Sequence, residues 1–148
     1  MDVTSASGYD KAGTGGGIYT PLLARRTGTS DYRVKVQATG TATTLQLLRS
    51  VNGTETVILS QAVSGMVYAP GDVWNMRFQV QGTGTTTLRA KIWKAGTTEP
   101  TAWRLTATDT TASLQAPGAV GILGYLSGSA TNAPVVLSVQ DFVVKPLA

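Results

Sequence analysis

The side chains that could carry out chemistry in this sequence are carboxylates, hydroxyls and amines, because its 148 residues include neither cysteine nor histidine. Their absence rules out zinc fingers, thiol or imidazole nucleophiles, Ser-His-Asp triads and disulfides. Glycoside hydrolysis needs only two carboxylates, about 5–9.5 Å apart in a cleft. Glu55 follows a predicted turn and Glu99 lies in a loop, with no E-x-D-x-x-E arrangement. We therefore expect no catalytic residues and no enzyme.

A resident metal or cofactor is equally unexpected. A calcium site needs several oxygen ligands that lie close together. The eight acidic residues are instead spread over the whole chain. The sequence predicts no metal site and no cofactor.

Aromatic rings offer a binding chemistry, because an exposed ring can stack on the apolar face of a sugar while polar neighbours orient its hydroxyls. The candidate ligand-binding rings are Tyr19, Trp93, Trp103 and Tyr125. The alternative is that large rings fill the core. We expect a core position for Trp74, and both interpretations stay open for Trp103.

A second candidate surface is basic. In the run from Leu88 to Trp93, the side chains of Arg89, Lys91 and Trp93 alternate with apolar ones and share a face. A neighbouring strand adds Arg77, and another carries Arg33 and Lys35. If these strands share a sheet, the face would suit an acidic polymer, a phosphate or an acidic protein. Alternatively, the cations cover a solvated face and discourage edge pairing. Nothing indicates specific nucleic-acid recognition, since no recognition helix or aromatic RNA-binding motif is visible.

These residues must be positioned by strands, because threonine is abundant and 17 glycines separate short runs of strand type. Asn52-Gly53 between two apolar runs predicts a tight hairpin. Trp74 to Val80 alternates strictly and should pair antiparallel with Leu88 to Trp93. The run from Val135 to Val144 is apolar at nearly every position, which favours a strand covered on both faces. The predicted core comprises Val34, Val36, Trp74, Met76, Phe78, Val80, Leu88 and Ile92.

The chain divides into residues 1–17, expected as a flexible N-terminal arm, and residues 18–148, expected as a single β-sandwich domain. The arm ends in a glycine-rich stretch after one aromatic residue, Tyr9. We expect Tyr9, Ile18 and Tyr19 to make assembly contacts. No secretory signal begins the sequence, and no apolar stretch approaches the ~20 residues that span a bilayer, so we expect no membrane partner.

The segment from Thr85 to Trp93, followed by Glu99-Pro100-Thr101-Ala102-Trp103, resembles laminin-G-like, concanavalin-A-like β-sandwich domains. Such domains occur in actinobacterial secreted proteins and in tail or capsid accessory proteins of actinobacterial phages. Asp31-Tyr32-Arg33 and Asp141-Phe142 support the resemblance, which extends from about Tyr9 to the C-terminus. It implies an all-β fold, an antiparallel two-sheet β-sandwich of jelly-roll type. Relatives usually carry a further strand upstream, so we expect an unpaired edge that a neighbouring chain could cover.

The resemblance favours a non-enzymatic structural or adhesion module, namely a virion accessory or decoration protein of a phage. Its partners would be further copies of itself or other virion proteins, and it would be made in the host cytoplasm and mounted on the virion. The alternative is a freestanding carbohydrate-binding module, working outside the cell on a cell-surface or cell-wall glycan.

Overall fold

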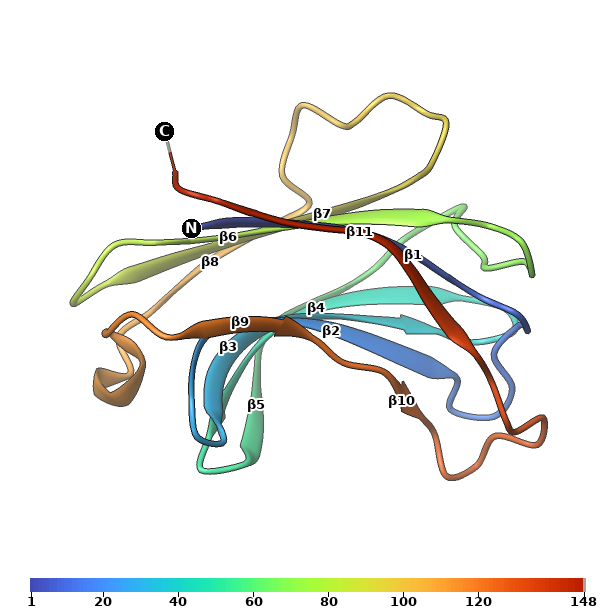
Figure 1. The fold of residues 1–148 in the computed structure, drawn as a ribbon, viewed down its shortest axis with the longest axis horizontal. Helices are drawn as coiled ribbons and strands as arrows, with labels where there is room; N and C mark the ends of the chain where they lie inside the picture. The colour runs from blue at the N-terminus through green and yellow to red at the C-terminus, as the bar shows by residue number, and fades with distance from the viewer. Residues whose placement is uncertain (148) are drawn as a thin grey trace.

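Short strands joined by tight turns build two antiparallel β-sheets in the computed structural model, which describes residues 1–147 (Figure 1). Sheet A has the order β11-β1-β6-β7-β8, and sheet B has the order β10-β2-β3-β4-β5, with β9 also paired to β2. Sheet A consists of β1 (Asp2–Tyr9), β6 (Trp74–Gln81), β7 (Thr86–Lys94), β8 (Leu105–Asp109) and β11 (Leu137–Lys145). Sheet B consists of β2 (Ile18–Thr27), β3 (Ser30–Ala38), β4 (Thr43–Val51), β5 (Thr54–Ala62), β9 (Ala119–Ile122) and β10 (Tyr125–Leu126). The sheets pack face to face, which confirms the predicted two-sheet β-sandwich.

One short 3₁₀ turn, η1 (Ala112–Leu114), lies between β8 and β9. Within residues 1–147 no helix has the length and apolar character to cross a membrane.

The hairpin between β4 and β5 forms where the sequence predicted it. Asn52 and Gly53 occupy the turn with φ of 51° and 84°, the left-handed values that a type I′ turn requires. The strands then pair from Val51↔Thr54 onward. This pairing places β5 at the edge of sheet B.

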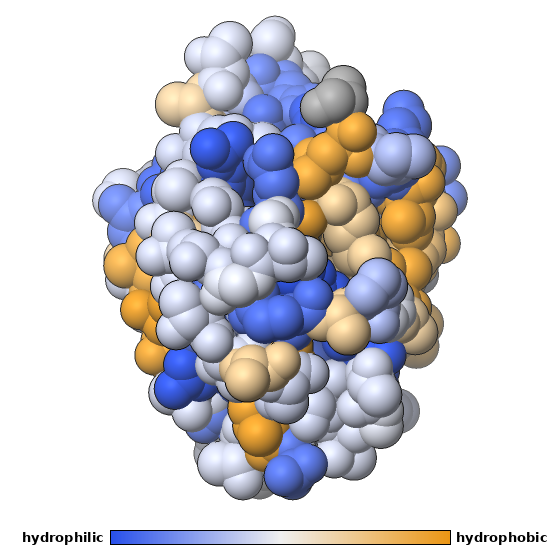
Figure 2. Space-filling view, turned by 90° about the vertical axis from the view of Figure 1, so that its left-hand side faces the viewer, coloured by the Kyte–Doolittle hydropathy of each residue, from blue (hydrophilic) through white to orange (hydrophobic). Residues whose placement is uncertain are grey.

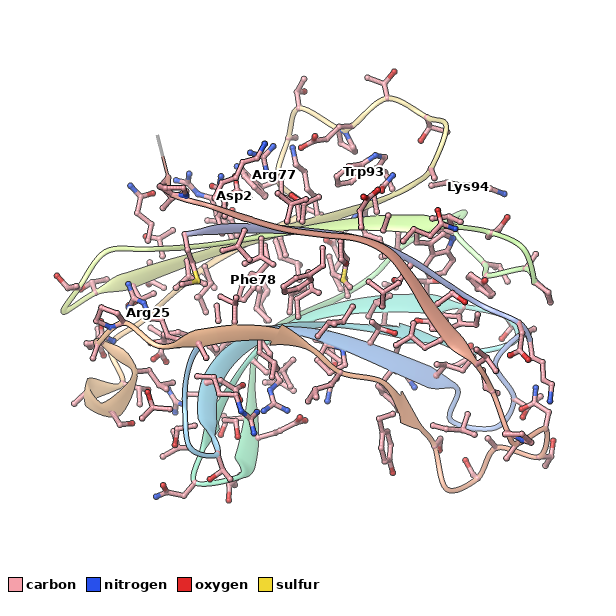
Figure 3. The ribbon with its side chains drawn as sticks, in the orientation of Figure 1. Asp2, Arg25, Arg77, Phe78, Trp93 and Lys94 are labelled. Carbon is pink, nitrogen blue, oxygen red and sulfur yellow. The ribbon has the colours of Figure 1, made fainter. Side chains whose placement is uncertain are left out.

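The core follows the predicted period of two. Trp74, Met76, Phe78 and Val80 of β6 are all buried, and β6 pairs antiparallel with β7 from Trp74↔Lys94 to Val80↔Leu88. The rest of the predicted core is buried as well, namely Val34, Val36, Leu88 and Ile92. Figure 3 shows Phe78 pointing from β6 into the space between the sheets.

The first residues of the chain differ from the expected flexible arm. Asp2–Tyr9 is an inner strand, β1, which pairs with β6 on one side and β11 on the other. Its small side chains gave the sequence no recognisable alternation, yet they allow close packing. A Cβ added at Gly8 would lie 2.4 Å from the carbonyl oxygen of Asp72, and one at Gly13 would lie 2.1 Å from that of Ala38. The residues expected in the arm are therefore built into the sandwich.

The last strand differs as well. β11 was expected to be covered on both faces, but it is an edge strand, because β1 occupies the neighbouring inner position. Its apolar side chains are partly exposed: 41% for Val139, 37% for Phe142, 41% for Val143 and 42% for Val144. A continuous apolar run does not distinguish an inner strand from an edge strand.

Candidate functional site

A groove of about 530 Å³ opens on the outer face of sheet B, the face turned away from the core. Strand alternation explains its lining, since its residues on β2 and β3 alternate along each strand with core residues such as Leu22 and Val34. In Figure 1 the β2–β3 and β4–β5 hairpins bend down at one end of this face and β10 lies at the other end. The groove is lined by Tyr19, Pro21, Arg33, Lys35, Glu55, Leu123, Gly124 and Tyr125.

Two tyrosines form the aromatic part of this groove. Tyr125 of β10 lies opposite Tyr19 of β2 in the sheet register, and their ring centroids are 5.7 Å apart with the planes tilted by 53°. Gln37 donates a hydrogen bond of 2.8 Å to the Tyr19 hydroxyl, and the Lys35 ammonium lies 5.4 Å from the Tyr19 ring centroid. Tyr19 is thus fixed from two sides, whereas the Tyr125 side chain is 61% exposed and available to a ligand.

A charged network forms the polar part of the groove. The Glu55 carboxylate accepts hydrogen bonds of 2.6 Å from both Arg33 and Lys35. Arg33 also donates to both oxygens of buried Asp31, at 2.7 and 2.8 Å. Burial alone would raise the pKa of Glu55, but the hydrogen bonds and charges of Lys35 and Arg33 outweigh it and hold that pKa below its ordinary value. The groove therefore presents an ionised acceptor between two cationic donors at neutral pH.

The outer face of sheet A carries the other candidate residues, under the loop between β7 and β8. Figure 3 shows Asp2, Arg77 and Trp93 on this side of the sheet. Arg77 donates to Asp2 at 2.9 Å and to Glu99 at 2.7 Å, and Lys91 pairs with the same Glu99 at 2.7 Å. The hydrogen bond from Lys91, together with that from Arg77, lowers the pKa of Glu99 against the opposing effect of burial. Acidic neighbours thus already engage Arg77 and Lys91.

Trp103 is held within this network. Its ring centroid lies 5.7 Å from the Arg77 guanidinium carbon and 4.7 Å from the Lys91 ammonium. Such cation–π contacts use the ring face that a sugar would need. Trp103 is only partly buried and lies outside the core cluster, while a sugar on its ring would compete with these cations.

The predicted ligand residues are divided between the two outer faces of the sandwich. Arg77, Arg89, Lys91, Trp93 and Trp103 belong to sheet A or to the loop that follows β7, whereas Tyr125 lies on sheet B. Arg33 and Lys35 were expected to extend the basic face if the strands shared a sheet. They lie on β3 of sheet B, so there is no single basic face.

The predicted assembly contacts are also divided. Tyr9 and Ile18 are only 5% and 4% exposed and belong to the core, so neither is available to a partner. The Tyr9 hydroxyl hydrogen-bonds the Thr20 hydroxyl at 2.6 Å inside the sandwich. Only Tyr19 reaches a surface, and that surface is the groove.

The carboxylates considered for hydrolysis are separated too. Glu55 lines the groove on sheet B, while Glu99 lies over sheet A. They cannot act as the acid pair that glycoside hydrolysis requires across one bond. Within the part of the chain that the structure describes, no group of three or more acidic residues could hold a metal ion.

No family model and no curated protein matches this sequence. Among solved structures, the fold is similar to the carbohydrate binding module CBM66 from Bacillus subtilis, with a TM-score of 0.59 and 15% sequence identity. The superposition covers 95% of this chain and 73% of that chain. The likeness extends over nearly the whole chain and shows that the two proteins share a β-sandwich fold.

Proposed function

We propose that this protein is a carbohydrate-binding module and that the groove on sheet B holds the sugar. The observation that carries the proposal is the exposed ring of Tyr125 beside the network of Glu55, Arg33 and Lys35. Ligand sites typically combine apolar and aromatic walls with a few well-placed polar groups. The similarity in fold to a carbohydrate binding module supports the same function.

The two parts of the groove would bind two different surfaces of a sugar ring. The C–H face would stack on Tyr125, whose position is supported by the neighbouring Tyr19 ring. The hydroxyls at the ring edge would donate to Glu55 and accept from Lys35 or Arg33. Hydrogen bonds to charged groups are shorter and stronger than neutral ones, so this network would fix the orientation of the ring.

The outer face of sheet A is a weaker candidate for the same function. Its indole at Trp103 is already in contact with two cations, and those cations are already paired with acidic groups. A sugar would have to displace these contacts before it could stack on Trp103. Stacking on Tyr125 in the groove on sheet B requires no such displacement, because this residue is 61% exposed.

The carbohydrate-binding function was the alternative in the sequence analysis, where the resemblance to phage proteins favoured a virion accessory protein. Neither the groove nor the likeness to CBM66 bears on a virion, a host or a cellular location. The virion role stays a prediction from that resemblance.

The test is glycan-array screening of the wild-type protein, followed by titration of the best glycan in solution. Tyr125→Ala should weaken binding by about tenfold or more, which corresponds to ~1.4 kcal/mol. Tyr125→Phe keeps the stacking surface and should retain most of the affinity.

Trp103→Ala is the matched control, because it removes an aromatic side chain from the opposite face. It should leave binding unchanged. A silent array, or a loss of binding in Trp103→Ala with none in Tyr125→Ala, would overturn the proposal.

A further inference from the structure

The edge of sheet A formed by β11 carries more exposed apolar surface than an isolated edge strand should. An unprotected edge offers unpaired N–H and C=O groups to another chain, and proteins usually guard it with charges, prolines or short length. β11 runs for nine residues, and Val139, Phe142, Val143 and Val144 are each between 37% and 42% exposed. In Figure 2 apolar side chains lie along both the right-hand and the left-hand margins of the molecule.

The sequence of this edge is self-complementary. Asp141-Phe142-Val143-Val144-Lys145 has opposite charges at equal distances from Val143. If two such strands pair antiparallel about Val143, each Asp141 lies opposite the Lys145 of the second copy. Phe142 lies opposite Val144 in the same way. A register centred on Asp141 would place two carboxylates face to face, which is unfavourable.

The local geometry allows this register and limits its length. The pairing of β11 with β1 is regular from Asp2↔Lys145 to Ala6↔Asp141, and a bulge follows at Gln140. Pro146 ends the strand on the other side and can donate no ladder hydrogen bond. Asp141 and Lys145 take part in no ion pair within residues 1–147, so both charges are available to a second copy.

The other edges lack this combination. β5 also exposes apolar side chains, with Val57 49% and Leu59 37% exposed. Its only charged residue is Glu55, which is engaged by Arg33 and Lys35 in the groove. β8 is five residues long, β9 is four and β10 is two. Among the edge strands that the structure describes in residues 1–147, only β11 offers both an apolar row and complementary charges.

We propose that two copies of this protein associate by antiparallel pairing of their β11 strands about Val143, which joins two A sheets into one continuous sheet. The occupant of the edge is a second copy of the same chain, because the charges match only when the strand meets itself in this register. The interface lies on sheet A and is independent of the groove on sheet B.

Charge exchange tests the register directly. Sedimentation equilibrium of the wild type should show a mass that rises with concentration from 15.4 kDa toward twice that value. Asp141→Lys or Lys145→Asp alone places like charges opposite each other twice per dimer, and each should raise the dissociation constant by roughly tenfold. The double variant Asp141→Lys/Lys145→Asp should restore the dissociation constant of the wild type. Mixing the two single variants should also restore association, because each Lys then meets an Asp.

Val143→Lys places two cations opposite each other at the centre of the interface and should abolish dimerisation. Val57→Lys, at a similarly exposed valine on the edge strand β5, is the matched control and should dimerise like the wild type. Circular dichroism establishes that each variant is folded. A wild type that stays a monomer up to millimolar concentration, a dimer unaffected by Val143→Lys, or a charge-exchanged double variant that fails to recover would each overturn the proposal.

Discussion

Asp109 at the end of β8 ties the two sheets together through a single carboxylate. It accepts a hydrogen bond of 2.8 Å from the Tyr32 hydroxyl on β3, pairs with Arg49 on β4 and accepts another 2.8 Å bond from the Thr111 backbone. Burial would raise its pKa, but the bonds from Thr111, Tyr32 and Arg49 prevail and lower it to about 2. The carboxylate is 5% exposed, so these interactions act with little screening by solvent.

Because folding lowers the pKa of Asp109, the free energy of unfolding depends on pH. Because the folded pKa of Asp109 is below its ordinary value of 3.8, its contribution is complete above that value and is lost as the pH falls toward 2. We expect Asp109→Asn to lower the free energy of unfolding at pH 7 by roughly 2 kcal/mol. The free energy of unfolding of this variant should fall less steeply than that of the wild type between pH 4 and pH 2. Urea unfolding at a series of pH values measures both effects, and parallel curves for the two proteins would contradict the assignment.

Glu55 makes a corresponding prediction for ligand binding. The groove needs this carboxylate ionised, and Lys35 and Arg33 hold its pKa below the ordinary 4.5 despite burial. Affinity for the glycan should therefore be constant from pH 7 to pH 5 and fall only below pH 4.5. Glu55→Gln should weaken binding throughout and remove this acid limb, measured by calorimetric titration. Glu99→Gln, a carboxylate with a lowered pKa on the opposite face, should bind like the wild type. A decline already complete at pH 5 would show that another group controls binding.

Among the strands, β1 gives the sharpest test of the fold. Val3 is fully buried opposite Phe78 of β6 and Val144 of β11. Val3→Ala should lower the free energy of unfolding by about 2 kcal/mol, because it removes buried methyl groups and leaves a cavity. Val57→Ala on β5, where the side chain is 49% exposed, should change stability by less than ~0.5 kcal/mol. Denaturant titrations of both variants suffice, and equal effects would show that residues 2–9 do not form an inner strand in solution.

The same elements show which strands the sequence could predict. β6 was predictable because every second residue is large and apolar, and the β4–β5 hairpin because Asn-Gly is nearly specific for its turn. β1 was not, since Ser5, Ala6, Ser7 and Gly8 carry too little apolar surface to reveal a period of two. β11 was identified as a strand but assigned to the wrong position. An apolar run of this kind occurs both in a covered inner strand and in a partly exposed edge strand, and the local sequence does not distinguish the two positions.

The groove depends on the whole molecule, which is why only part of it was predicted. Tyr19 and Tyr125 are far apart in the chain and meet because β10 pairs with β2. Both were named as aromatic candidates, but Glu55 was considered only as a catalytic acid and Arg33 and Lys35 only as part of a basic face. The alternation along β3 correctly predicted that Arg33 and Lys35 point away from the core. It could not tell which sheet they belonged to, because that follows from strand order rather than from any local pattern.

The two sheets should unfold together, because neither has a core of its own. One apolar cluster takes residues from both sheets, including Leu22 and Tyr32 of sheet B and Trp74 and Phe78 of sheet A. At one end, Arg25 of β2 donates a hydrogen bond of 2.8 Å to Thr86 of β7. Separating the layers would expose the apolar faces of both at once, so no half-folded state should be populated.

This expectation can be measured with one tryptophan as the probe of sheet A. In the variant Trp93→Phe/Trp103→Phe, fluorescence reports only Trp74, which is 4% exposed in the core. Its urea midpoint should coincide with that of far-ultraviolet circular dichroism, which reports all strands. Adding Arg25→Ala should move both midpoints down together, by about 1–2 kcal/mol, because it breaks the hydrogen bond between the sheets and removes a partner from Thr86. A fluorescence transition that precedes the loss of circular dichroism would mean that sheet A opens while sheet B persists, and the shared core would then not be what holds the sandwich together.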